Sequence, residues 1–131
     1  MRLTRQLLLP LASGLLLASG LLLAGCTPEF ASVEITPITD PPLDVTISST
    51  QVELMVGIAV AVNVTGLDDD GDPVDQISCT PPASITAGVI ETAQPDQFIF
   101  YGMSHGSGSL NFTTASVGGT VVVPIRIVPQ P

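Results

Sequence analysis

The sequence has 131 residues, with 12 acidic residues, 3 that are Lys or Arg and one His, so its formal net charge is −9. Every acidic residue lies after residue 25, where Arg126 is the only arginine, and the chain has no lysine. Because phosphate binding needs Lys or Arg to displace counterions, this balance excludes nucleic-acid binding.

The first 25 residues have the composition of a targeting segment. Arg2 and Arg5 form a short basic head, and residues 6–25 are almost entirely Leu, Ala, Ser and Gly. An apolar run of this length could also span a bilayer, which takes about 20 residues, so an uncleaved membrane anchor is the alternative. The small residues before Cys26, and the polar sequence without a basic cluster that follows, favour cleavage.

The residues Leu23-Ala24-Gly25-Cys26 resemble the lipobox of bacterial lipoproteins. The resemblance implies cleavage after Gly25, a diacylglyceryl group on the Cys26 thiol, and a further acyl chain such as palmitate on the new amino terminus. Several acyl chains on one residue anchor a protein stably in a membrane. Thr27 follows where Asp signals inner-membrane retention in some sorting systems, so the outer membrane is favoured if the source is Gram-negative.

Lipidation of Cys26 leaves Cys79 without a partner for a disulfide. We expect Cys79 to be a small, buried, apolar residue of a strand. A reactive or intermolecular free thiol is the alternative. A catalytic thiol would need a basic neighbour to lower its pKa, and the sequence after residue 25 has only one Arg and one His to supply it.

Residues 26–44 are predicted to form an extended, semi-rigid linker that is rich in proline, with a possible short strand over residues 32–35. Residues 45–131 are predicted to form one folded domain. Apolar and polar residues alternate there in short segments separated by Gly, Pro and Asp, which is typical of strands with one buried face. The segments are residues 45–48, 51–55, 57–65, 74–79, 84–91, 97–102, 109–115 and 120–128.

This pattern of about seven strands predicts an all-β fold, a β-sandwich. The strand pair in residues 52–66, the turn in residues 68–75 and the two closing strands in residues 106–128 resemble the bacterial immunoglobulin-like domains of surface proteins. The resemblance implies an immunoglobulin-like sandwich that serves adhesion, surface architecture or protein–protein interaction.

Residues 68–75, called the acidic turn below, contain alternating carboxylates at Asp68, Asp70 and Asp72. Alternating aspartates are frequent calcium ligands, but an EF-hand loop that starts at Asp68 is excluded because its twelfth position is not glutamate. A turn is the simpler explanation, since Gly71 supplies a positive φ and aspartate favours turns. Crowded carboxylates keep a weak structural calcium site as the alternative.

No catalytic residues are predicted. The segment Gly102-Met103-Ser104-His105-Gly106 matches the G-x-S-x-G pattern of serine hydrolases. That motif requires a following helix and a histidine later in the chain, and the sequence provides neither, so a flexible Gly/Ser loop is expected. Alternation places Phe98 and Phe100 in the core and Tyr101 on the opposite, more exposed face.

These observations predict a non-enzymatic, lipid-anchored protein of the bacterial cell envelope. Its expected contacts are the membrane, through the lipid on Cys26, and another envelope protein, and it needs no cofactor. The alternative function is a module for calcium or another small ligand, in which the acidic turn and residues 102–108 form a site at one end of the sandwich.

Overall fold

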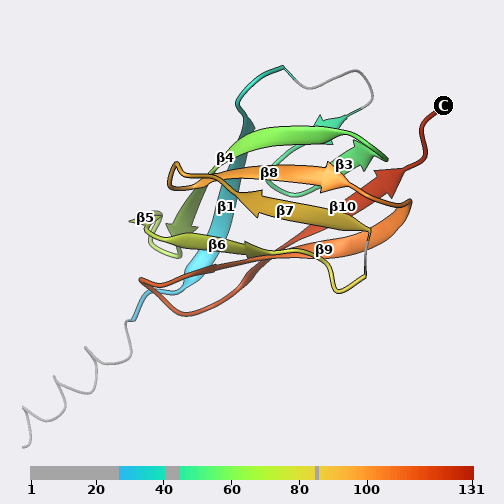
Figure 1. Ribbon diagram of the computed structural model, residues 1–131. Helices are drawn as coiled ribbons and strands as arrows, with labels where there is room; N and C mark the ends of the chain where they lie inside the picture. Colours follow the sequence, from blue (N-terminus) through green and yellow to red (C-terminus); the bar gives the residue numbers. More distant parts are fainter. Residues whose placement is uncertain (1–26, 41–44, 85) are drawn as a thin grey trace, which may run out of the picture.

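The computed structural model describes residues 27–40, 45–84 and 86–131. It is an all-β structure of two sheets that pack face to face (Figure 1). The first sheet contains β1 (Phe30–Pro37), β4 (Ala59–Asp68), β5 (Pro73–Val74), β7 (Ala87–Glu91) and β8 (Gln97–Gly102). The second sheet contains β2 (Thr46–Ile47), β3 (Val52–Met55), β6 (Ile77–Thr80), β9 (Gly106–Thr114) and β10 (Val121–Val128).

The first sheet has the order β1-β4-β8-β7, with β5 pairing with the end of β4, and all of its pairs are antiparallel. The second sheet has the order β2-β3-β10-β9-β6, and in it β3 runs parallel to β10. The alternation in the sequence therefore predicted the sandwich correctly. Its ten strands exceed the expected number of about seven, partly because β2 and β5 have only two residues each.

The core lies between the two sheets and is built from the alternate residues that the pattern predicted. Val60, Val62 and Val64 of β4 are buried, as are Leu110 and Phe112 of β9. The rings of Phe98 and Phe112, which come from opposite sheets, meet edge to face with their centroids 6.5 Å apart. Burial of such alternate apolar side chains stabilises both sheets at once.

Strand β1 corrects the expected linker over residues 26–44. Eight residues, Phe30–Pro37, pair with β4, and Phe30, Val33 and Ile35 are buried in the core. Pro28 precedes the paired region and Pro37 is its last residue, so neither proline interrupts the pairing. The sandwich therefore begins near residue 29, well before residue 45.

The proline inside β10 occupies a position where no neighbouring strand requires its missing N–H group. β3 pairs with β10 only over Ile125–Val128, so Pro124 lies just outside this paired region. The side chain of Pro124 is exposed, and that of Val123 is buried. A proline is tolerated inside a strand at such a position, because no ladder hydrogen bond is lost.

Candidate functional site

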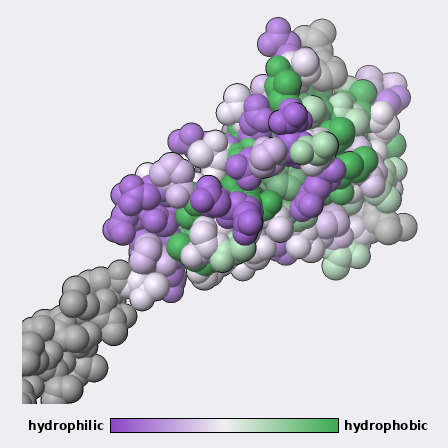
Figure 2. Space-filling view, turned by 60° about the vertical axis from the view of Figure 1, so that its left-hand side comes forward, coloured by the Kyte–Doolittle hydropathy of each residue, from purple (hydrophilic) through white to green (hydrophobic). Residues whose placement is uncertain are grey.

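Acidic side chains gather at the end of the sandwich where the described chain begins. β1 and β6 start at this end, β4 and β7 finish there, and Figure 2 shows hydrophilic residues at the corresponding left-hand end of the visible face. We call it the acidic end. Its acidic residues are Glu29, Asp68, Asp69, Asp70, Asp72, Asp75, Glu91 and Asp96.

The acidic turn is held by the carboxylate of Asp68, the last residue of β4. Its Oδ1 accepts hydrogen bonds from the backbone N–H groups of Asp70, at 3.0 Å, and of Asp72, at 2.9 Å. Gly71 has a φ of 84°, as the expected turn requires. The turn also contacts the start of the chain, because the backbone N–H of Asp69 donates to the carbonyl of Glu29 at 2.9 Å.

The structure groups the carboxylates differently from the expected calcium site. One carboxylate oxygen each from Asp68, Asp69 and Asp70 lies within 4.8 Å of the others. Asp72 is outside this group, and Asp69, which the alternating pattern passed over, is inside it. The turn brings the carboxylates of three consecutive residues together. The expected set of alternate aspartates assumed that the loop is extended.

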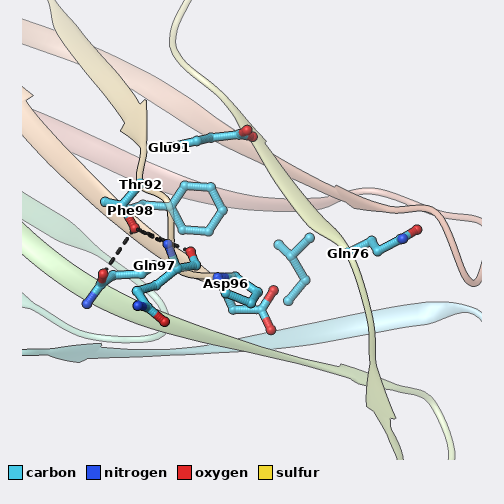
Figure 3. A pocket seen from close by; sticks show the side chains of 9 residues that line it. Gln76, Glu91, Thr92, Asp96, Gln97 and Phe98 are labelled. Atoms are coloured by element: carbon cyan, nitrogen blue, oxygen red, sulfur yellow. Dashed lines mark hydrogen bonds between the residues drawn. The ribbon is translucent and has the colours of Figure 1, made fainter.

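A small polar pocket of about 120 Å³ lies at the same end, between the start of β6 and the hairpin that joins β7 to β8 (Figure 3). Thr92 Oγ1 donates to Gln97 Oε1 at 3.0 Å across the hairpin. Gln76 and Asp96, which also line the pocket, have φ values of 56° and 62°, in the left-handed region that residues other than glycine rarely adopt. Its lining contains no histidine, cysteine or lysine, and its ionisable groups are the carboxylates of Glu91 and Asp96.

Sequence reasoning did not identify this pocket. The hairpin side of the pocket could have been recognised in the sequence, because Pro95-Asp96 is a turn dipeptide and Asp tolerates a left-handed conformation. Gln76 has no such signal, since glutamine is not a turn residue. Its backbone is set by the tertiary structure, where the chain passes from β5 in one sheet to β6 in the other.

Cys79 is a buried free thiol on β6, as expected from the sequence. Burial, with a smaller contribution from the negative charge of Glu91, raises the pKa of the Cys79 thiol from 9.0 to about 12. A thiol with this pKa stays protonated at neutral pH and is a poor nucleophile. The structure thus places Cys79 in the environment of an inert core residue.

The raised pKa of Cys79 predicts a loss of stability at alkaline pH. The unfolded thiol ionises near pH 9 and the folded thiol near pH 12, so the folded state holds the extra proton between these values. Below pH 9 the free energy of unfolding is unaffected by the ionisation of this thiol. As the pH rises from 9 toward 12, the free energy of unfolding falls by at most about 1.4 kcal/mol per pH unit. We expect urea unfolding of the Cys79→Ala variant to show a shallower alkaline decline than that of the wild type. Equal slopes would show that Cys79 does not contribute to the decline.

The second expected site, which combined the acidic turn with residues 102–108, is not formed. Ala59 at the start of β4 pairs with Tyr101, whereas Asp68 at the end of β4 begins the acidic turn. The two loops are therefore at opposite ends of a ten-residue strand, about 30 Å apart. Gly106–Thr114 forms β9, so part of the expected flexible loop is a strand, and no helix follows Ser104 in the described chain.

Tyr101 has a structural role on the outer face of the first sheet. A Cβ atom on Gly88, its partner on β7, would lie 2.0 Å from Tyr101 Cζ, so the ring covers this glycine. An aromatic ring over a strand glycine replaces the side-chain packing that glycine lacks. The expected exposure of Tyr101 is therefore only partial, and Phe98 and Phe100 are buried as predicted.

Cys26 and the preceding residues lie outside the described part of the chain, so their predicted cleavage and lipidation remain predictions. Within the described residues, no helix has the length and apolar character needed to cross a membrane.

The fold resembles that of domains in a bacterial surface-layer protein. Domains 4 and 5 of the S-layer protein SbsC match with a TM-score of 0.52 and 19% sequence identity, over 78% of this chain and 54% of the SbsC chain. A longer SbsC structure, domains 4–9, matches with a TM-score of 0.55 and 18% identity, over 80% of this chain and 15% of that chain. The chain thus spans only part of each SbsC structure, and identities this low show the fold alone.

Comparisons at the level of sequence gave no relative. No protein-family model matches the chain. No curated protein sequence matches it at a significant level.

Proposed function

We propose that this protein is a lipid-anchored structural module of the bacterial cell envelope that binds another envelope protein and has no enzymatic activity. The observation that carries the proposal is the fold shared with SbsC domains, which belong to a surface-layer protein. The lipobox at Leu23-Ala24-Gly25-Cys26 supplies the membrane attachment.

The strand order supports the more specific assignment to the immunoglobulin-like class. In constant-type immunoglobulin domains one sheet has the order A-B-E-D and the other contains C, F and G. The order β1-β4-β8-β7 corresponds to A-B-E-D, and β6, β9 and β10 correspond to C, F and G. Here β3 adds a parallel strand beside β10.

The positions of the two chain ends suggest how the domain stands on the membrane. The described chain starts at the acidic end, and β10 runs toward the opposite end, where Gln130 Nε2 donates to the carbonyl of Val56 at 2.7 Å (Figure 1). Since β1 begins at Phe30, few residues separate a lipid on Cys26 from the sandwich. The acidic end would then lie close to the headgroups, with the C-terminal end directed away from the bilayer.

The proposal is tested by replacing the lipidated residue. We expect the wild-type chain to fractionate with membranes and to give a mature mass that starts at an acylated Cys26. The Cys26→Ser variant should lose the acyl mass and leave the membrane fraction. Retention of residues 1–25 by the wild-type protein, or an unmodified Cys26, would overturn the proposed anchoring, and hydrolysis of ester, peptide or glycoside substrates would overturn the non-enzymatic role.

A second candidate function is calcium binding at the acidic turn. It is favoured by the approach of carboxylate oxygens from Asp68, Asp69 and Asp70 to within 4.8 Å. The internal hydrogen bonds of Asp68 explain the turn without a metal ion. Calcium titration followed by calorimetry distinguishes the two, because binding heat that disappears in the Asp69→Asn variant would support the site.

A further inference from the structure

One edge of β10 is only partly covered. On one side β9 pairs with it over Val121–Ile127, but on the other side β3 pairs only over Ile125–Val128. Just before β10 in the chain, the carbonyl of Gly118 accepts a hydrogen bond from the backbone N–H of Phe30 at 2.8 Å. Among the described residues, no strand pairs with residues 121–124 on this side, which leaves a gap between Phe30 and the start of β3.

The hydrogen bond between Val56 and Val128 shows which backbone groups point into this gap. The carbonyl of Val128 accepts from the N–H of Val56 at 2.9 Å and therefore points away from β9. In a parallel ladder, alternate residues direct both their N–H and their C=O groups to the same neighbour. Val122 and Pro124 share the parity of Val128, so they direct these groups into the gap. Because proline has no N–H, Val122 is the donor there.

Strand β1 borders the same space with an edge that no strand of the described residues pairs with. The N–H of Ile35 donates to Ser49 Oγ at 3.3 Å, so alternate residues of β1 point away from β4 at this edge. Val33, two residues earlier, has the same parity and directs its N–H and C=O outward. The two edges border one groove of about 290 Å³, lined by Ala31, Ser32, Val33, Ser49, Thr50, Val121 and Val122.

We infer that this groove binds a short extended segment of a partner protein, which adds a strand beside residues 121–124 of β10. The inference rests on the proposed function, because it identifies how the envelope module holds its partner. Main-chain hydrogen bonds to an open strand edge are an established basis for binding extended peptides. Four residues of strand span about 13 Å, so the segment that fits is short.

The lining and the surrounding charges define the chemistry of this segment. The lining residues are small or β-branched and uncharged, which suits alternating valine and threonine. Beyond Ala31 and Val121, at one end of the groove, Glu29 forms an isolated bridge with Gly118. The backbone N–H of Glu29 donates to Asp69 Oδ1 at 3.2 Å, and the side chains of both residues are exposed. A lysine or arginine at the corresponding end of the segment would meet these two carboxylates. A second copy of the chain is a poor partner, because Arg126 is the only Lys or Arg among the described residues.

The test removes the donor at Val122 and keeps the rest of the groove. The Val122→Pro variant loses the N–H that points into the gap, and no bond to β9 is lost with it. The matched control is Val122→Thr, which keeps the N–H and the β-branched shape. The probe is a synthetic peptide of alternating valine and threonine with lysines at one end, titrated onto the full chain purified in detergent. We expect the Kd to rise about tenfold in Val122→Pro, as for the loss of one main-chain hydrogen bond, and to be unchanged in Val122→Thr.

A second measurement does not depend on the folding of the proline variant. A photo-crosslinking amino acid at position 122 of the otherwise unchanged protein should join the peptide, whereas the same group at the exposed Thr113 of β9 should not. Three results would overturn peptide binding in the groove. They are equal affinities of the two variants, equal crosslinking at both positions, and no peptide binding at millimolar concentration. These results would leave the envelope role intact, since fractionation of Cys26→Ser tests that role separately.

Discussion

A chain that begins at residue 45 is expected to be unfolded. If residues 26–44 were only a linker, the same chain would fold. Such a chain lacks β1, whose Phe30, Val33 and Ile35 are each no more than 6% exposed. Burial of three such side chains contributes roughly 5–9 kcal/mol. Because whole domains are stable by only about 5–15 kcal/mol, this loss removes most or all of the stability.

The truncation is best compared with a chain that begins at residue 27, which retains β1 and its pairing with β4. Circular dichroism and thermal melting of the longer chain should show a cooperative β-sheet transition, and the shorter chain should show none. A cooperative transition in both chains would mean that residues 27–44 are a linker after all. Val33→Ser in the longer chain is a milder version that leaves the backbone of β1 intact.

Replacement of Phe112 by alanine is expected to cause the largest destabilisation among single substitutions in the core. Phe112 is 0% exposed, and its ring meets that of Phe98 at an interplanar angle of 86°. Truncating a buried phenylalanine costs about 3–5 kcal/mol, and an aromatic pair adds about 0.5–1.5 kcal/mol. The melting temperature should therefore fall by more than about 12 °C.

The neighbouring residue Thr113 provides the control for this substitution, because it is exposed on the same strand. Thr113→Ala should change the free energy of unfolding by no more than about 0.5 kcal/mol. Phe112→Leu, which leaves a smaller cavity, should be intermediate. If Phe112→Ala cost less than about 1 kcal/mol, Phe112 would not pack between the two sheets as described.

The sequence was a good guide to the central strands and a poor one to β1. In β4 and β9, the buried residues alternate without interruption, as a strand with one buried face requires. In β1, the pairing register shifts between Phe30 and Ser32, and this irregularity lets Phe30 and Val33 both point inward although their positions differ by an odd number. A rule of period two cannot recognise such a strand, and the flanking prolines made a linker the more natural interpretation.

The candidate sites divide in the same way. The acidic turn was predictable, because Gly71 and the aspartates favour a turn by local chemistry. The grouping of Asp69 with its two neighbours was not, since it depends on how the turn is closed by Asp68 and by the start of the chain at Glu29. The distance between this turn and residues 102–108 was equally inaccessible, because it follows from the pairing of β4 with β8.

The sequence by itself determined the acidic character of the chain, its all-β class and the inward positions of its regular strands, since charge and alternation are properties of neighbouring residues. It also supplies the motif from which lipidation of Cys26 is predicted. Only the tertiary structure decided that β1 belongs to the domain, that Gln76 and Asp96 border one pocket, and that part of β10 lacks a partner beside β1. These features arise from pairing between residues far apart in the chain, because a strand's edge is open or closed according to which other strands reach it.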